Sequence, residues 1–315
     1  LLATSCIAGL MALGGVSAHA QTFPTKPLKF VVPFPAGSAT DTVGRVVAQA
    51  MSDALGQPIA VDNKAGANGI PGADSVKTAV GDPYTLLVTT STTQAANVSL
   101  YKKLPYDPVK DFTPIGMIGS TGFILMVKPE FPAKDMKEFV AYAKANKLAY
   151  GHGSSGSLVS GALVAQLGGF EALGVPYKGI PPALVDLMGG QLQFAFADVG
   201  NAMTQINGGK LKGLGVTTAK RAGKAPNIAP IGDTVKGYEV SAWFALMAPA
   251  NIPAADAKKL GDTLRAVLAK PEVKEKLANA GIDLDVQDSA ALARTIEAEI
   301  KKWSGGVKVA GITPE

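Results

Sequence analysis

Small residues join a short apolar strand to a helix over residues 31–41 (VVPFPAGSATD), the stretch of the chain best suited to binding chemistry. Apolar residues recur at helical spacing as far as Leu55, and Thr40 and Asp41 are candidate caps for that helix. A helix start leaves backbone N–H groups unpaired and carries a partial positive charge. Because small residues let an anion approach those groups, the turn predicts a carboxylate site. The alternative is a tight turn in which glycine supplies only backbone freedom.

A second loop of similar composition spans residues 151–157 (GHGSSGS) and places three serine hydroxyls before another predicted helix. Two such loops favour ligand binding more than either one alone, because a ligand between them would meet helix starts from both sides. The loop also matches the G-x-G-x-x-G pattern of dinucleotide sites. That interpretation is disfavoured, since Glu171 lies before the next predicted strand and does not end it.

Serine hydrolysis is the enzymatic alternative that these residues raise. A serine nucleophile needs a base within hydrogen-bond reach and a third group that orients the base. After residue 20 the chain has one histidine, His152, which lies two residues from Ser154, and the chain has no G-x-S-x-G elbow. We therefore expect no enzymatic activity. A secreted serine hydrolase stays open as an alternative, detectable as ester turnover that Ser154→Ala or Ser155→Ala abolishes.

The N-terminal segment has the pattern of an export signal. Residues 7–16 are apolar and small, and Ala18-His19-Ala20 has the A-x-A form of a cleavage site. This pattern predicts a cleavable signal peptide over residues 1–20. No later segment approaches the length that spans a bilayer, so we expect no membrane insertion. Cleavage would remove Cys6, the single cysteine, which disfavours thiol chemistry, and we expect no metal site and no cofactor.

Composition and charge limit the possible partners. The chain has 315 residues, of which 47% are apolar and 17% charged, as in an ordinary soluble globular protein long enough for two domains. A net charge of +5 favours anionic ligands. Scattered lysines and an aromatic content of 6% argue against nucleic acid. The four arginines lie outside the small-residue loops, so we expect no bidentate arginine clamp on the ligand.

Short β-rich runs alternate with helical patterns, which predicts an α/β fold of two lobes, each a sheet flanked by helices. We expect the chain to cross between the lobes near residues 119–123 and 242–249. The first lobe then comprises residues 21–120 plus 247–315, and the second lobe residues 121–246. In open α/β sheets ligands bind beyond the carboxyl ends of strands. The small-residue loops lie at such ends, over residues 35–40, 89–93, 151–157 and 198–201.

Four single residues are further candidates around such a site. Asp198 ends an otherwise apolar predicted strand and could accept a hydrogen bond from a ligand amine, hydroxyl or protonated acid, and its alternative role is a helix cap. Phe34 and Trp243 are candidate pocket walls, although single aromatic residues usually belong to a core. Lys178 could reach a second acidic group of the ligand, and its alternative is a solvated lysine.

Taken together, these segments resemble the Bug proteins, the periplasmic receptors of tripartite tricarboxylate transporters. The resemblance covers nearly the whole chain after residue 20, and its most specific segment is residues 104–112 (LPYDPVKDF). The other matching segments are residues 32–41 (VPFPAGSATD), 63–69 (NKAGANG), 150–157 (YGHGSSGS), 175–179 (VPYKG), 186–191 (DLMGGQ), and Trp243 with Ala248-Pro249.

The resemblance implies a two-lobed periplasmic binding protein of the Venus-flytrap type, type II-like, whose lobes close on a ligand. It implies a monomer that captures a small organic carboxylate, such as a di- or tricarboxylate or an aromatic acid, for the membrane permease subunits of the transporter. A carboxylate-sensing partner of a two-component receptor is the remaining alternative.

The resemblance also implies site residues. In the family, backbone N–H groups and ordered waters of the first loop and of the serine-rich loop hold a ligand carboxylate, and residues near Ser91, Thr92 and Asp198 help to choose the ligand. On this chain the carboxylate positions are Phe34, Ala36, Gly37 and Ser38, with Ser154, Ser155, Gly156 and Ser157. Two positions depart from the family pattern: Ser38 stands where the family usually has a second glycine, and Ser160 where it usually has a histidine.

Overall fold

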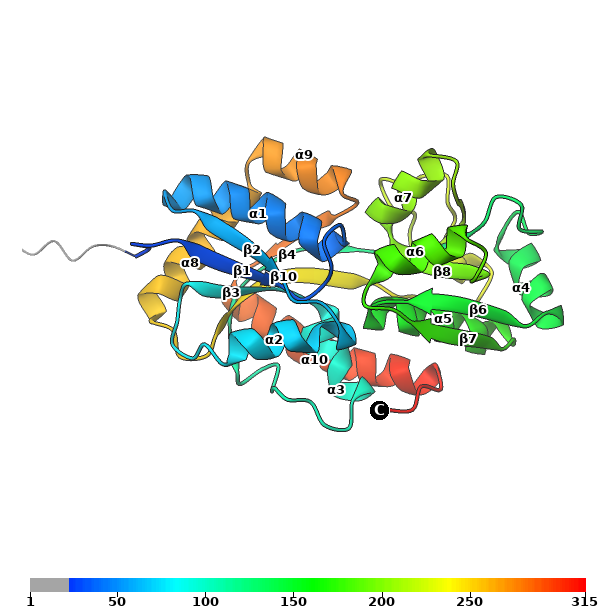
Figure 1. Cartoon of the computed structure of the whole chain (residues 1–315), viewed down its shortest axis with the longest axis horizontal. Helices are drawn as coiled ribbons and strands as arrows, with labels where there is room; N and C mark the ends of the chain where they lie inside the picture. Colours follow the sequence, from blue (N-terminus) through cyan, green and yellow to red (C-terminus); the bar gives the residue numbers. More distant parts are fainter. Residues whose placement is uncertain (1–22) are drawn as a thin grey trace, which may run out of the picture.

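Two β-sheets organise the chain, one in each lobe (Figure 1). The structure is a computed structural model, and it describes residues 23–315. The predicted signal peptide over residues 1–20, with Cys6 and the Ala18-His19-Ala20 cleavage site, lies outside the described residues. Helices flank both sheets, which confirms the predicted α/β fold of two lobes.

The first sheet and its helices make up the first lobe. Its strands are β1 (Leu28–Val32), β2 (Ile59–Asn63), β3 (Thr85–Thr90), β4 (Phe112–Thr121), β10 (Ala242–Pro249) and β11 (Asp283–Gln287). Its helices are α1 (Ala39–Leu55), α2 (Ile70–Lys77), α3 (Asn97–Leu100), α8 (Ala254–Leu268), α9 (Pro271–Asn279) and α10 (Ser289–Val309), with the short turns η1 (Ala67–Gly69) and η2 (Thr92–Ala96).

The second sheet and its helices make up the second lobe. Its strands are β5 (Phe123–Val127), β6 (Leu148–His152), β7 (Ala172–Pro176), β8 (Phe194–Asp198) and β9 (Lys212–Val216). Its helices are α4 (Met136–Ala145), α5 (Ser155–Gly168), α6 (Ile180–Met188) and α7 (Val199–Asn207), with the turn η3 (Ile231–Asp233).

Both sheets mix parallel and antiparallel pairs. The strand order is β11-β4-β10-β3-β1-β2 in the first sheet and β7-β6-β8-β5-β9 in the second. In the first, β1 is parallel to β2 and β3, whereas β10 runs antiparallel to β3 and β4. In the second, β6 is parallel to β7 and β8, whereas β5 runs antiparallel to β8 and β9. Helices cover both faces of each sheet, so central strands such as β5 and β10 are apolar along their whole length.

Connections between the lobes lie at two places predicted from the sequence and at one that was not. Gly122 separates β4 from β5, and the return runs directly into β10. We expected residues 242–246 in the second lobe. They belong to the first sheet instead, because β10 pairs with β4 from Ala242 onward. The third connection is α10, whose last turns run along the second lobe (Figure 1). Trp303 and Val307 of α10 pack in one apolar cluster with α4 and α5.

Candidate functional site

A narrow cavity of about 50 Å³ lies between the two lobes. The first lobe lines it with Phe34, Ser38, Ala39, Thr40, Thr90, Thr92, Thr121, Ala242 and Phe244, and the second lobe with Phe123, Gly153, Ser154, Ile180 and Asp198. Four of the five second-lobe residues and most first-lobe residues lie at strand ends or helix starts. A volume of this size holds only a few water molecules, so the lobes lie close together.

The start of α1 forms one wall of this cavity. Ser38 is the N-cap, and its hydroxyl accepts a hydrogen bond from the Asp41 amide. The Gly37 amide donates to the Asp41 carboxylate, and the Ser38 amide donates to the Pro35 carbonyl. Within the described residues, the amides of Ala39 and Thr40 donate to no protein acceptor. These two N–H groups are therefore the ones that α1 offers to a ligand.

Asp41 holds the turn before α1 in place. Its carboxylate accepts hydrogen bonds from Arg45, from the Gly37 amide and from Asn63, whose amide group also donates to the Phe34 carbonyl. Burial acts to raise the pKa of Asp41, but the hydrogen bonds from Arg45, Gly37 and Asn63 hold that pKa below its usual value. A charged carboxylate at Asp41 thus fixes the loop without facing the ligand.

The start of α5 forms the opposite wall. Ser154 is the N-cap of α5, and it forms a capping box with Ser157. The Ser157 hydroxyl also accepts hydrogen bonds from the amides of Gly153 and Ser154. In the part of the chain that the structure describes, the amides of Ser155 and Gly156 have no protein acceptor. The start of α5 thus has unpaired N–H groups, as the start of α1 has. Ala39 and Thr40 line the cavity themselves, whereas Ser155 and Gly156 lie directly behind the lining residue Ser154. The two caps, Ser38 and Ser154, line the same cavity.

Asp198 is the one charged side chain among the residues that line the cavity. It is 6% exposed and caps α7, where it accepts hydrogen bonds from the amide and the side chain of Asn201 at 3.1 and 3.0 Å. Burial raises the pKa of Asp198, against the lowering effect of those hydrogen bonds. The cavity therefore combines unpaired amide donors at its helix starts with one buried acceptor that no cation neutralises within the described residues.

Aromatic and aliphatic side chains complete the cavity. Phe34, Phe123, Phe244 and Ile180 line it and give it a largely apolar surface. Trp243 does not line it, because neighbouring residues of a strand point to opposite faces of the sheet. The Trp243 indole instead donates a hydrogen bond to Glu299 of α10.

The structure separates the sequence-predicted site residues into two groups. Phe34, Ser38, Thr92, Ser154 and Asp198 come together around the cavity from both lobes. The residues predicted as ligand contacts that do not line it are Ala36, Gly37, Ser91, Ser155, Gly156 and Ser157. Lys178 does not line it either.

The second group has identifiable roles close to the cavity. Gly37 and Ser157 are engaged in hydrogen bonds within their own loops. Gly156 lies against the Phe123 ring, where an added Cβ would stand 2.3 Å from the ring. The Ser155 hydroxyl donates to Asn97. Ser91 is fully buried, and its hydroxyl has no hydrogen-bond partner among the described residues.

Several lining residues were not predicted from the sequence. Thr40 was expected only as a cap, and Thr90 lies at the end of β3 within the loop predicted at 89–93. Phe123, Thr121 and Phe244 come from the strands that cross between the lobes. The positions at which the chain crosses between the lobes were predicted. These residues could have been predicted from those positions, because the segments that join two lobes lie at the bottom of the cleft between them.

A direct contact between the lobes lies beside the cavity. Pro35 of the first loop packs against Gly179, the residue before α6, and a Cβ on Gly179 would stand 2.5 Å from Pro35 Cγ. Gly179 in turn lies against Gly153, whose added Cβ would stand 2.1 Å from the Gly179 carbonyl carbon. Glycine is thus needed at Gly179 for the loops of the two lobes to approach this closely, and at Gly153 for the two second-lobe loops to pack against each other.

His152 does not have the surroundings of a catalytic base. Its imidazole lies 5.9 Å from the Tyr150 ring, centroid to centroid, and its carbonyl accepts a hydrogen bond from the Tyr177 amide. Burial lowers the pKa of His152 to about 4. His152 does not line the cavity that contains Ser154.

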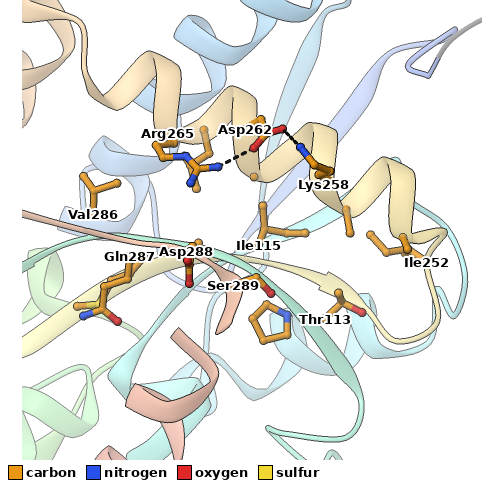
Figure 2. Close-up of a pocket in the computed structure, with 17 residues that line it drawn as sticks. Thr113, Ile115, Ile252, Lys258, Asp262, Arg265, Val286, Gln287, Asp288 and Ser289 are labelled. Carbon is orange, nitrogen blue, oxygen red and sulfur yellow. Dashed lines mark hydrogen bonds and ion pairs between the residues drawn. The ribbon is translucent and has the colours of Figure 1, made fainter. Parts of the chain in front are cut away.

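A larger hollow of about 440 Å³ lies on the outer side of the first lobe, between α8, β4 and the β11–α10 connection (Figure 2). Figure 2 shows Asp262 between Lys258 and Arg265, with each cation 2.6 Å from an Asp262 oxygen. The basic groups of this hollow, Lys258 and Arg265, are therefore paired with Asp262 of the same helix, α8. The floor of this hollow contains apolar residues such as Ile115 and Ile252.

Neither a metal site nor a membrane span is found in residues 23–315. In that range no three side chains of His, Cys, Asp or Glu gather closely enough to ligate an ion. None of the helices over the same range combines the length and the apolar character that crossing a bilayer requires.

Comparisons with known proteins agree with this architecture. Residues 43–312 match the family described as "Tripartite tricarboxylate transporter family receptor". Protein BugT of Bordetella pertussis is 30% identical over 312 residues, which cover 96% of this chain and 95% of that protein. The structure of R. palustris Rpa4515 with adipate is similar at a TM-score of 0.90 and 32% identity, covering 93% of this chain and all of that one (100%). MatC (Rpa3494) from Rhodopseudomonas palustris with bound malate has a TM-score of 0.85 and 32% identity, covering 90% and 100%.

Proposed function

The chain belongs to the tripartite tricarboxylate transporter receptor family, and on that premise we propose that it captures a small organic carboxylate between its lobes in the periplasm. As a monomer, it then presents the acid to the membrane permease subunits of such a transporter. Export by the signal predicted over residues 1–20 brings it to that compartment. The adipate and malate bound to two structural neighbours support a carboxylate ligand.

One observation carries this function: two helices begin at the same cavity from opposite lobes. The caps Ser38 and Ser154 line it, and the first amides of α1 and α5 have no acceptor among the described residues. Among residues 23–315, no lysine, arginine or histidine lines the cavity. An anion bound there is stabilised by backbone N–H groups and the positive ends of two helix dipoles.

The far end of the ligand meets a different environment. Asp198 is a buried acceptor, and the surrounding wall is largely aromatic. A hydroxyl or an ammonium group would donate to Asp198, whereas a second carboxylate would face it without a cation nearby. Among organic acids, the site thus favours one carboxylate with a hydrogen-bond donor at the other end over a dianion of the same length.

Binding also favours lobe closure. The two sets of amides belong to different lobes, so only a closed arrangement brings both to one carboxylate. A ligand that binds the closed arrangement better shifts the population toward it. The permease can then distinguish loaded from empty receptor by the position of the lobes.

A thermal-shift screen of organic acids on the purified protein tests this function. The panel contains acids of similar length: butyrate, 4-hydroxybutyrate, 4-aminobutyrate, succinate, malate, adipate, citrate and benzoate. Preferential binding to the folded state raises the melting temperature. At least one acid is expected to do so, with the uncharged amide of the same acid as control. Absence of a shift with every acid would overturn the proposed function.

The lack of enzymatic activity is tested in parallel. We propose that the chain performs no turnover, because the described part of the chain lines its cavity with no basic side chain that could take a proton from Ser154. Aryl esters of the panel acids should not be hydrolysed above the background rate. Turnover that disappears with Ser154→Ala would instead support a hydrolase.

A further inference from the structure

The Ser155 hydroxyl reaches across the lobes to Asn97 of α3, with 3.1 Å between Ser155 Oγ and Asn97 Oδ1. Both side chains are fully buried. Ser155 is the first residue of α5 and follows Ser154, the N-cap that lines the cavity. The hydroxyl of a residue next to the cavity lining is thus committed to a partner in the other lobe.

Asn97 is itself held by the first lobe. Its side-chain amide donates to the Asn68 carbonyl at 3.0 Å and to the Tyr106 hydroxyl at 3.2 Å. Tyr106 donates in turn to the Thr93 carbonyl at 2.7 Å. Thr93 belongs to the segment of Thr90 and Thr92, which line the cavity. A continuous set of buried hydrogen bonds therefore joins the α5 start to a cavity-lining segment of the first lobe.

The surroundings of this bond are apolar and span both lobes. Ala95, Ala96 and Leu100 of the first lobe share one buried cluster with Val159 of α5 and Trp303 of α10. Parting this cluster would expose apolar surface to water. The α3–α5–α10 junction is therefore a stabilising contact between the lobes, and it surrounds the Ser155–Asn97 hydrogen bond.

From this geometry we propose that Asn97 is a positioning residue for ligand capture, which fixes the first turn of α5 relative to the Thr90–Thr92 segment through Ser155. An apolar junction tolerates small slips between packed helices, because dispersion contacts are not directional. A buried hydrogen bond is directional and leaves an unpaired polar group when it breaks. Asn97 therefore sets the spacing at which the amides of α1 and α5 converge on one carboxylate.

The inference also gives a role to the segment at 104–112. Tyr106 of that segment is buried and packs edge-on against the Phe112 ring at 5.8 Å between centroids. Its hydroxyl both accepts from Asn97 and donates to Thr93. Tyr106 thus holds the Nδ2 atom of Asn97 while Ser155 donates to its Oδ1 atom, although Tyr106 does not line the cavity.

A pair of matched serine variants tests the proposal. Ser155→Ala removes the bond to Asn97 but keeps the α5 amides and the Ser154 cap. Ser160→Ala is the control, since Ser160 is an equally buried serine of α5 whose hydroxyl has no partner among the described residues. Asn97→Leu removes the acceptor from the other side. If this variant does not fold, the serine pair still decides.

Distance measurements between spin labels give the first readout and need no ligand. The labels are placed at exposed Ala54 of α1 and Gln166 of α5, each changed to Cys in a chain with Cys6→Ser. Wild type and Ser160→Ala should give the same narrow distribution, whereas Ser155→Ala and Asn97→Leu should broaden or shift it. An unchanged distribution in Ser155→Ala would overturn the inference.

Calorimetric titration with 4-hydroxybutyrate and with succinate gives the second readout, and this arm rests on the proposed function. Ser155→Ala should weaken binding about fivefold to tenfold, as expected for one lost buried hydrogen bond. Asn97→Leu also loses the bonds to Asn68 and Tyr106, so it should weaken binding at least as much, and the double variant no more than Asn97→Leu alone. Ser160→Ala should stay within twofold. Lower melting temperature with unchanged affinity would reduce Asn97 to a stabilising role and overturn the inference. If wild type binds neither acid, the choice of ligand class is at fault, and the spin-label distances alone decide the inference.

Discussion

Gly179 of the second lobe lies so close to Pro35 of the first that a Cβ on Gly179 would stand 2.5 Å from Pro35 Cγ and 2.6 Å from its Cδ. The proline ring cannot turn away as a flexible side chain can. Pro35 precedes α1 of the first lobe, and Gly179 is the N-cap of α6 in the second lobe. Their contact therefore limits how far the lobes can close.

Gly179→Ala should hold the lobes slightly open. Carboxylate affinity should fall about tenfold, because the amides of α1 and α5 no longer reach one ligand together, while stability changes by less than about 1 kcal/mol. Titration calorimetry and small-angle scattering measure the two effects. Gly223→Ala is the control, since an added Cβ at Gly223 meets nothing within 4 Å. Unchanged affinity in Gly179→Ala would show that the contact does not set closure.

Asp198→Asn should reverse the ranking of the acids by affinity. Asparagine caps a helix as well as aspartate does, so α7 keeps its N-cap, but the buried negative charge is gone. Wild type should prefer 4-aminobutyrate and 4-hydroxybutyrate to succinate. The variant should bind 4-aminobutyrate at least tenfold more weakly and succinate more tightly, since like charges no longer meet.

The comparison of the three acids separates two errors. If succinate is the tightest ligand of wild type, the assignment of the ligand's far end is wrong, although the carboxylate function stands. If Asp198→Asn leaves all three affinities unchanged, Asp198 caps α7 and does nothing for the ligand.

Asp41→Ala should loosen the first loop. The carboxylate accepts from Gly37, Arg45 and Asn63, and its loss leaves the Gly37 amide unpaired. The free energy of unfolding at pH 7 should fall by about 1–3 kcal/mol. Asp53→Ala is the control, because Asp53 is an exposed acid of the same helix, and this change should stay within about 0.5 kcal/mol.

The effect of Asp41→Ala depends on pH with a definite sign. The pKa of Asp41 is lowered in the folded protein, so its contribution is complete above the unfolded pKa of 3.8. It is lost as the pH falls through the folded value. Urea unfolding at pH 7 and pH 3 measures this effect. The difference in the free energy of unfolding between wild type and Asp41→Ala should be smaller at pH 3. An equal difference at both values would contradict a charge-based role.

His152→Gln should reduce the acid sensitivity of the fold. Burial lowers the pKa of His152 to about 4, against 6.5 for an ordinary histidine. Between these values the unfolded chain binds more protons than the folded one, so wild type loses stability as the pH falls from 6.5 toward 4. This loss amounts to roughly 3 kcal/mol at most.

Urea unfolding at pH 7 and pH 4.5 measures the loss. The variant lacks the titrating imidazole, so its free energy of unfolding should decrease less than that of wild type between pH 7 and pH 4.5. Parallel slopes would mean that His152 titrates at its ordinary pKa and is not desolvated.

Residue types and spacing alone predicted the α/β fold class, the two lobes and the two loops that open onto α1 and α5. These features depend on local chemistry, because serine caps, small residues before a helix and apolar periodicity act within a few residues of one another. The loops that contain Ser38 and Ser154 were predicted for this reason, and the two residues themselves were implied by the family resemblance; both line the cavity. The prediction that Thr40 or Asp41 caps the first helix was wrong, because the Ser38 hydroxyl accepts from the Asp41 amide and Ser38 is the N-cap. The sequence also placed Asp198 at a strand end, where it lines the cavity and caps α7.

Contacts between distant parts of the chain determine which groups remain free for a ligand. The Gly37 amide is taken by Asp41, and the Ser155 hydroxyl by Asn97, 58 residues earlier in the chain. Phe244 faces the cavity and Trp243 does not, because the register of β10 in the first sheet sets which side chains point inward. Which amides, hydroxyls and aromatic side chains face the ligand depends on partners that strand pairing and lobe packing bring together. Residue types and spacing within one segment do not predict those partners.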